Sequence, residues 1–460
     1  MRAWLVVAFL IIGFVAVGCN QAATPPTTAP TGAMAAPTSA APAATAEAAP
    51  PPSTAAAPTT APAVATTMAP GPTAVVPPPT GAAVAAVPRA VQPTGAPVQG
   101  AAPRLLVYVR DNALWAVGFD GAPPRRISPE GMYPLPDQDT TVQPALVSPD
   151  MRWVIGTGPE AKQGTWLFAT DGSSQRKLAE ARVIASWAPN SQGYAWADET
   201  AVYVATLAEG ARPLTAARLE GTARVQPNAV SWAPQGDQIL FQVKDGDTVS
   251  LRSVSAAGGP VKTLAQVKMD MPTEYGPDVL AWSPDGARAL WVLPSPTRVV
   301  AMDGSPAVEL PTDIARVYGF TPDGKRLLAV WRAGNNYRLG TTDLAGKDRR
   351  EVAAAKGDFG YGSVSPDGRQ IAYIRFPDDG PGPPETNELW LVGVDGQGPR
   401  RLGQGTDLAP FSADWLGLSA LLVANGEKPP EISLRRVDAG SGAAQKLVDQ
   451  VGWFFAIAPR

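Results

Sequence analysis

The sequence contains no histidine and a single cysteine in 460 residues. Without histidine there is no Ser-His-Asp or Cys-His catalytic unit, no histidine-bound zinc, and no imidazole that titrates near neutral pH. One cysteine excludes an intrachain disulfide and a site with several thiolate ligands. The formal net charge of −3 argues against nucleic acid as a partner, because a protein that contacts phosphates along a strand needs a basic surface. The functions left open are catalysis by carboxylates, catalysis by hydroxyl groups, and binding without catalysis.

Long apolar runs are also scarce. The clearest one extends from Leu5 to Val17, behind the single positive charge of Arg2. It is shorter than the roughly 20 residues of a membrane-spanning helix, and its features predict a secretory signal over residues 1–18. Ala16-Val17-Gly18-Cys19 resembles the lipobox of bacterial lipoprotein signals. The resemblance implies that Cys19 becomes the lipidated first residue. An ordinary signal peptide with an incidental cysteine, or an uncleaved anchor, is the alternative, and each predicts export.

Residues 19–103 have a biased composition. Between residues 20 and 103 there are 29 Ala, 19 Pro and 14 Thr, together 62 of 84 positions, and no aromatic residue. So few large apolar side chains cannot offset the conformational entropy lost on folding. We therefore expect a disordered tether that separates the remaining chain from a membrane.

Residues 104–460 contain an internal repeat of a short turn motif. The clear copies contain Pro at positions 38 to 50 residues apart: Ser148-Pro149-Asp150, Ala188-Pro189-Asn190, Ala233-Pro234-Gln235-Gly236, Ser283-Pro284-Asp285-Gly286, Thr321-Pro322-Asp323-Gly324 and Ser365-Pro366-Asp367-Gly368. Phe411-Ser412-Ala413-Asp414 is interpreted as a degenerate seventh copy. Apolar runs follow each copy, and Asp-Gly pairs separate some of them, which is typical of hairpins.

Each repeat predicts four short antiparallel strands, A to D, with the proline turn between A and B. Four strands in about 45 residues are typical of a β-propeller blade. Because residues 105–117 form an extra strand pair and residues 453–457 resemble an A strand, we predict an all-β, eight-bladed propeller closed by the C-terminal strand. Seven blades with one divergent unit is the alternative. Trp187, Trp232 and Trp282 share one repeat position, which predicts packing between blades.

The repeat resembles the WD40-like propeller repeats of the TolB family. The resemblance rests on Trp/Phe-Ser-Pro-Asp-Gly, on an apolar strand, on Leu389-Trp390 ahead of Asp395-Gly396, and on Arg400-Arg401-Leu402. It implies a propeller over residues 104–460 and suggests contacts between proteins of the cell envelope. The copies at Asn190-Ser191 and Ala413-Asp414 depart from the motif.

Long segments between strands predict the binding face. A–B and C–D turns share one end of a blade, which we call the turn end, and B–C and D–A connections share the other, the loop end. We place the long segments 128–146, 214–229, 265–279 and 376–387 at the loop end, where functional residues concentrate. The candidate ligand-binding residues are Met132, Tyr133, Asp137, Asp139, Met269, Met271, Glu274, Tyr275, Asp278, Phe376, Asp378 and Asp379.

These observations favour a non-catalytic binding or scaffolding module that is lipid-anchored outside the cytoplasm of a bacterium. We expect a protein, peptide or cell-wall glycan as ligand, a monomeric body, no nucleic-acid partner, and no cofactor or metal. Asp137, Asp139, Asp378 and Asp379 have too few neighbouring ligands for a dedicated calcium loop. The alternative is a carboxylate-dependent, glycan-active enzyme, which needs two carboxylates about 5–10 Å apart.

Overall fold

The structure is a computed structural model. It describes residues 105–119, 122–130, 132, 145–157, 164–180, 185–208, 213–268, 280–293, 296–376, 386–404, 408, 410–426, 432–452 and 455–457. The predicted signal, Cys19 and the predicted tether lie outside these ranges.

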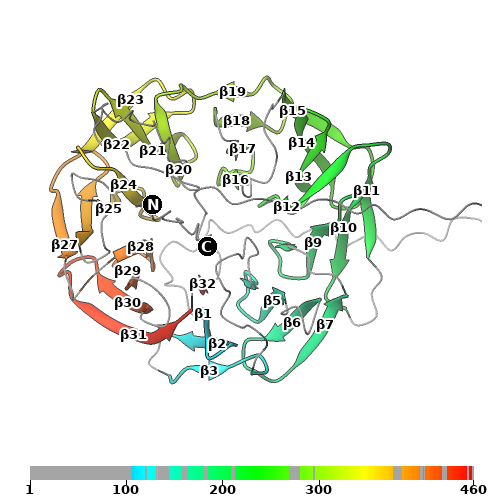
Figure 1. The fold of residues 1–460 in the computed structure, drawn as a ribbon, viewed down its shortest axis with the longest axis horizontal. Coiled ribbons are helices and arrows are strands. Elements are labelled where there is room, and N and C mark those ends of the chain that lie inside the picture. The colour runs from blue at the N-terminus through cyan, green and yellow to red at the C-terminus, as the bar shows by residue number, and fades with distance from the viewer. Residues whose placement is uncertain are drawn as a thin grey trace, which may run out of the picture. The chain divides into compact units, whose positions relative to one another are not determined.

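The described residues form eight four-stranded antiparallel sheets arranged as the blades of a ring (Figure 1). Blade 1 contains β32 (Phe455–Ile457), β1 (Leu105–Arg110), β2 (Ala113–Gly118) and β3 (Arg125–Arg126). Blade 2 contains β4 (Ala145–Val147), β5 (Trp153–Thr157), β6 (Thr165–Ala169) and β7 (Gln175–Ala179). Blade 3 contains β8 (Ala185–Trp187), β9 (Gly193–Ala197), β10 (Ala201–Thr206) and β11 (Leu214–Arg218). Blade 4 contains β12 (Arg224–Trp232), β13 (Gln238–Asp245), β14 (Thr248–Ser255) and β15 (Lys262–Lys268).

The second half of the ring repeats this arrangement. Blade 5 contains β16 (Leu280–Trp282), β17 (Arg288–Trp291), β18 (Arg298–Ala301) and β19 (Val308–Glu309). Blade 6 contains β20 (Ile314–Phe320), β21 (Arg326–Ala333), β22 (Asn336–Asp343) and β23 (Arg349–Ala355). Blade 7 contains β24 (Phe359–Val364), β25 (Gln370–Arg375), β26 (Glu388–Gly393) and β27 (Arg400–Gln404). Blade 8 contains β28 (Pro410–Trp415), β29 (Ala420–Asn425), β30 (Ile432–Asp438) and β31 (Ala444–Val451).

Strand β32 closes the ring. It pairs antiparallel with β1, with Leu106, Val107 and Tyr108 opposite Ile457, Ala456 and Phe455. The first blade is therefore built from both ends of the described chain, and the predictions of eight blades and C-terminal closure are confirmed. Closure gives β1 a partner on each side and removes an exposed strand edge.

The proline turns adopt one geometry in six blades. The N–H of Gly368 donates to the carbonyl of Ser365 at 2.8 Å, and Gly368 has a φ of +73°. Gly286 repeats both features, which favour glycine because it has no Cβ. Ser191, in the copy that departs from the motif, makes the same turn with a φ of +60°. The departure at Asn190-Ser191 therefore leaves the turn geometry intact.

Tryptophans at the end of the A strands link neighbouring blades. Trp187 donates its Nε1–H to the carbonyl of Leu146 in blade 2 at 3.0 Å. Trp282 donates to the Oγ of Ser231 in blade 4 at 2.9 Å. The predicted packing of these residues between blades is confirmed.

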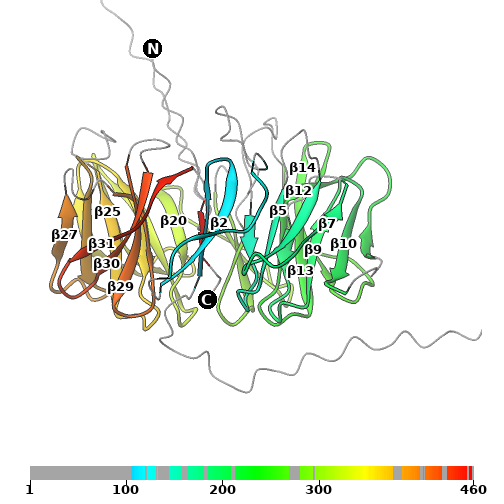
Figure 2. The ribbon, with the colours of Figure 1, turned by 90° about the horizontal axis from the view of Figure 1, so that it is seen from below.

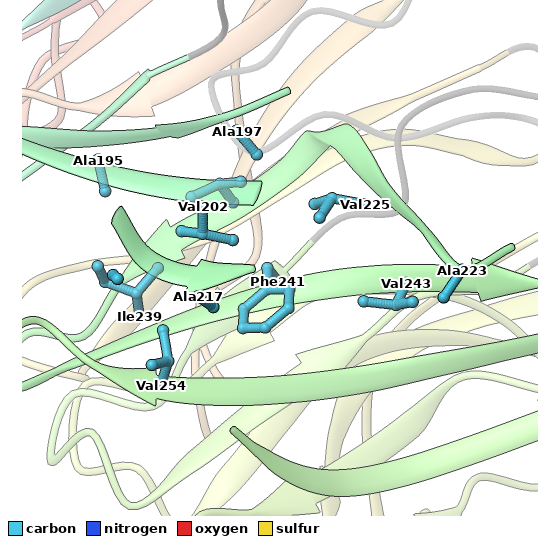
Figure 3. Close-up of a cluster of buried hydrophobic side chains, with 12 residues drawn as sticks. Ala195, Ala197, Val202, Ala217, Ala223, Val225, Ile239, Phe241, Val243 and Val254 are labelled. Atoms are coloured by element: carbon cyan, nitrogen blue, oxygen red, sulfur yellow. The ribbon is translucent and has the colours of Figure 1, made fainter. Parts of the chain in front are cut away.

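The core consists of apolar layers between blades. Between blades 3 and 4, Val202 faces Phe241 and Ile239, and the smaller Ala195 and Ala217 fill the remaining space (Figure 3). The B strands are apolar at consecutive positions because each blade is covered on both sides. In β29, for example, all six residues are buried. The strands extend between the two ends of the ring, so the connections lie on those ends (Figure 2).

Three sequence interpretations are wrong, the third of them in part. Phe411–Asp414 is not a turn but part of strand β28, and the A–B turn of blade 8 follows it, with Leu416 donating its N–H to the carbonyl of Ala420 at 2.8 Å. The segment 214–229 is not a long loop, because strand β11 and the start of β12 occupy most of it. Similarly, Lys262–Lys268 is strand β15, which takes residues 265–268 from the predicted loop 265–279.

Candidate functional site

Most of the predicted ligand-binding residues lie outside the described part of the chain. These are Tyr133, Asp137, Asp139, Met269, Met271, Glu274, Tyr275, Asp278, Asp378 and Asp379. Two of the predicted residues are described. Met132 is 1% exposed and packs into the core between blades 1 and 2, so its assignment as a contact residue is wrong. Phe376 lies at the loop end of blade 7, where it was expected.

Phe376 is held against the first residues of strand β24. Its N–H donates to the carbonyl of Asp358 at 3.0 Å. Its ring lies directly over Gly360, where a Cβ would overlap the ring. The glycine thus permits the close approach of the ring to the backbone, and the partly exposed Phe376 has a fixed place beside Asp358.

Asp358 forms an ion pair between blades with Arg316 of strand β20. The guanidinium Nη2 lies 2.9 Å from Oδ2, and Nη1 lies 3.3 Å from Oδ1, so the pair is bidentate. The Arg316 side chain is 13% exposed and that of Asp358 is 21% exposed. Arg316 also donates to the carbonyl of Phe359. Burial alone would lower the pKa of Arg316, but its interactions with Tyr318 and Asp358 raise it, so the side chain remains cationic.

Tyr318 completes this arrangement. Its hydroxyl donates to the carbonyl of Phe359 at 2.8 Å and accepts from Arg316 at 3.5 Å. Burial raises the pKa of Tyr318 to about 12, so the hydroxyl stays protonated at neutral pH. The ring of Tyr361 lies 6.2 Å from that of Tyr318, and, unlike Tyr318, Tyr361 is partly exposed.

Arg316, Tyr318, Asp358, Tyr361 and Phe376 form what we call the blade 6–7 group. Its carboxylate is already engaged by a cation, and its buried hydroxyl is protonated and hydrogen-bonded. The group therefore offers a rigid surface with two partly exposed aromatic rings rather than a free nucleophile or base. The sequence analysis found Phe376 but missed the other four residues. A loop-length criterion cannot find them, because Arg316, Tyr318 and Tyr361 are strand residues.

A second cluster surrounds Glu388 at the start of strand β26. Its carboxylate accepts from Trp390 Nε1 at 2.9 Å and lies 3.1 Å from Arg401 Nη1. Arg375 Nη1 is 3.8 Å away. The Glu388 side chain is only 20% exposed, so three donors surround a largely buried carboxylate. The chain's own donors therefore already occupy the hydrogen-bonding positions around this carboxylate.

A cavity of about 220 Å³ lies at the turn end, between blades 4 and 5. Its lining includes Gln235, Gln238, Trp282, Asp285 and Met302. It is smaller than the roughly 300 Å³ at which most small-molecule sites begin, and it lies at the opposite end from the predicted binding face. Among the described residues, no group of three His, Cys, Asp or Glu side chains is arranged to bind a metal ion.

The described residues form no helix with the length and apolar character that crossing a bilayer requires.

No protein-family model matches the chain, and no curated protein does. Solved structures do match. The dihydro-heme d1 dehydrogenase NirN in complex with DHE has 16% identity and a TM-score of 0.53, covering 80% of this chain and 79% of that one. Dipeptidyl peptidase 4 of Porphyromonas gingivalis has 11% identity and a TM-score of 0.54, and the match covers 76% of this chain and 59% of that one.

A TolB protein of Agrobacterium tumefaciens is also similar, with 17% identity and a TM-score of 0.32 over 51% of this chain and 87% of that one. At that score the overlay adds nothing to the argument, and the resemblance to TolB repeats rests on the repeat motif alone. Similarity at such low identity shows the fold alone. The comparisons together with the eight sheets therefore establish that this chain is an eight-bladed β-propeller.

Proposed function

We propose that this protein is a non-catalytic binding or scaffolding module, lipid-anchored outside the cytoplasm, whose ligand is a protein, a peptide or a component of the cell envelope. The observation that carries the proposal is the blade 6–7 group. It places partly exposed Tyr361 and Phe376 on a backbone made rigid by the Arg316–Asp358 pair. Aromatic side chains with little conformational freedom are typical anchors of protein interfaces.

The electrostatics of the described carboxyl groups support binding over catalysis. Ten of the described aspartates have a lowered pKa, as at Asp285, whose carboxylate accepts from the hydroxyl of Ser283. Such groups are ionised at neutral pH. Glycoside hydrolysis requires a carboxylic acid whose pKa is raised, so that it can protonate the leaving group.

The attachment to a membrane rests on Cys19 and its sequence context, and a labelling experiment tests it. An alkyne fatty acid supplied to cells that express the full chain should label the wild-type protein. The Cys19→Ser variant should carry no label and should leave the membrane fraction. Equal labelling of both proteins would contradict the lipid anchor and leave the binding function open.

An affinity pull-down tests the binding function. The full chain should recover a ligand from an envelope extract, and a deletion confined to residues 269–279 should reduce that recovery. The deletion must spare Lys262–Lys268, because these residues form strand β15. The control variant shortens the exposed turn at residues 303–306, which lies at the turn end, on the other side of the ring. Equal recovery from all three proteins would remove the loop end from the proposed binding surface.

A further inference from the structure

Blades 1 and 7 share four residues at the loop end. In blade 7, Tyr373 is opposite Trp390, which is opposite Arg401, and Arg375 ends strand β25. In blade 1, Tyr108, Trp115, Arg126 and Arg110 occupy the same register positions. The two blades thus present the same two arginines and two aromatic rings.

Blades 1 and 7 differ at one residue, the first residue of the C strand, which the shared side chains surround in blade 7. Glu388, which pairs with Arg375 across the strands, is replaced by Ala113, which pairs with Arg110. In blade 7 the carboxylate of Glu388 satisfies Arg375, Trp390 and Arg401. Blade 1 retains both arginines but supplies no carboxylate at that position.

The position is also charged in blade 6, with the signs reversed. Arg338 occupies the place of Glu388, and Glu351 occupies the place of Arg401. Their side chains form an ion pair of 2.9 Å. In both blades a charge on the C strand is therefore matched by an opposite charge on the D strand, and blade 1 keeps only the D-strand charge.

The polar atoms of blade 1 reflect this difference. Arg110 is 20% exposed and stacks on Trp115, with its guanidinium carbon 4.1 Å from the ring centroid. Among the described residues, its buried Nε has no hydrogen-bond partner. The hydroxyl of Tyr108, a fully buried residue, has no partner within this part of the chain either. The Trp115 Nε1–H donates to the carbonyl of Arg110 at 3.0 Å, which fixes the indole.

We propose that blade 1 binds a carboxylate supplied by a partner, such as the Glu or Asp side chain of an acidic peptide segment, in the position that Glu388 fills in blade 7. Arg110 supplies the guanidinium, held in place by its stacking on Trp115, and Arg126 supplies a second cation from strand β3. The ring of Tyr108, whose centroid lies 5.8 Å from the guanidinium carbon of Arg110, also helps to hold that guanidinium in place. A preorganised guanidinium loses little freedom when it binds a carboxylate, which favours Arg over Lys in such sites.

The described acidic groups near this site are weak competitors. Asp111 lies 3.7 Å from the Arg110 Nε and is 73% exposed. Glu130 lies 3.3 Å from Arg126 and is 78% exposed. Asp449 is paired with Lys446 at 2.9 Å. Ion pairs between exposed side chains contribute little because water and salt screen them, so a partner's carboxylate can displace Asp111 and Glu130.

The test measures binding of a fluorescein-labelled Gly-Glu repeat peptide to the full chain by fluorescence anisotropy. A Gly-Gln repeat peptide is the neutral control and should bind more weakly. Arg110→Gln should weaken binding of the acidic peptide by about tenfold, the value of one charge-assisted hydrogen bond. Ala113→Glu should weaken it similarly, because the introduced carboxylate fills the site from within.

The matched control is Arg375→Gln, which removes the equivalent arginine where Glu388 already occupies the site. It should leave the affinity unchanged. Equal weakening by Arg375→Gln and Arg110→Gln would overturn the proposal, because it would reveal non-specific attraction to positive charge. Wild-type affinity in a folded Ala113→Glu variant would overturn it too, and Arg110→Gln decides alone if that variant does not fold.

This inference rests on the proposed binding function, but the two can fail separately. Loss of the peptide interaction with intact pull-down recovery would reject only the carboxylate site. Failure of the wild-type chain to recover any ligand in the pull-down would reject the proposed function, whether or not the chain binds the peptide.

Discussion

Gly452 donates its backbone N–H to the carbonyl of Val109 at 2.7 Å, so the end of the chain is bonded to the first blade ahead of strand β32. The neighbouring Val451 is fully buried in the layer between blades 8 and 1. Ring closure therefore combines backbone pairing with apolar burial.

Deletion of residues 450–460 should strongly destabilise the propeller. It removes β32, exposes the edge of β1 and takes Val451 out of the layer between blades 8 and 1. We expect a loss of about 3 kcal/mol or more, and a fall in Tm of roughly 5 °C or more, from the lost apolar burial alone. Thermal unfolding followed by circular dichroism measures it. A shorter deletion of residues 458–460 spares β32 and serves as control, and an unchanged Tm in the longer deletion would contradict closure.

Trp282 and Trp232 occupy one repeat position but differ in hydrogen bonding. Trp282 donates to Ser231 at 2.9 Å, whereas the buried Nε1 of Trp232 has no partner. Trp282→Phe should therefore cost about 1–2 kcal/mol more than Trp232→Phe, because only the first variant loses a hydrogen bond. Urea unfolding of both variants measures the difference. A larger loss of stability for Trp232→Phe would show that ring packing, and not the indole hydrogen bond, determines how much each substitution destabilises the protein.

The repeat could be predicted because the proline turn is a local signal, and the eighth blade and the closure could be predicted from the extra strand pair at residues 105–117 and the A-like strand at residues 453–457. Pro149, Pro189 and Pro284 mark the turn wherever they occur, whether or not glycine follows. Blade 8 lacks this proline, so the motif was assigned to Phe411–Asp414, which are strand residues. Leu214–Arg218 was missed as a strand because its Thr-Ala-Ala centre has little apolar character, although pairing with β10 fixes it.

The candidate site was less predictable for a physical reason. Phe376 follows a strand directly and could be found from loop position. Arg316 and Asp358 are 42 residues apart and meet only because consecutive blades pack side by side. The difference between Ala113 and Glu388 has meaning only when the strand registers of two blades are compared. Sequence patterns reveal the repeat, whereas contacts across the repeat require the structure.

The turn aspartates should make the propeller sensitive to acid. The Ser283 hydroxyl lowers the pKa of Asp285 below its ordinary value of 3.8, and the Thr321 hydroxyl does the same for Asp323. A carboxyl group whose pKa is lower in the folded state stabilises it above the unfolded pKa, and that contribution is lost as pH falls through the folded pKa. Tm should therefore be constant above about pH 5 and fall below about pH 4.

The double variant Ser283→Ala/Thr321→Ala tests the cause of this acid sensitivity. Without the two hydroxyl donors, the pKa values of Asp285 and Asp323 should rise toward 3.8, and Tm should depend less on pH below pH 4. Ser255→Ala, which removes an exposed hydroxyl that accepts from the backbone N–H of Ala257, is the control. A double variant whose Tm falls as steeply as that of the wild type would assign the acid sensitivity to other groups.

The Arg316–Asp358 pair should contribute more to stability than the ion pairs at the rim. Asp358→Asn leaves a guanidinium that is only 13% exposed without its counter-charge. Breaking such a pair from one side should cost about 2–3 kcal/mol, because the remaining charge stays poorly solvated. Glu180→Gln, which breaks the exposed Lys177–Glu180 pair, should cost less than about 1 kcal/mol. Chemical unfolding of Arg316→Met, Asp358→Asn and the double variant separates the charge effect from packing. If the double variant lost the sum of the two single losses, Arg316 and Asp358 would act independently, and the pair could not be what makes the backbone under Phe376 rigid.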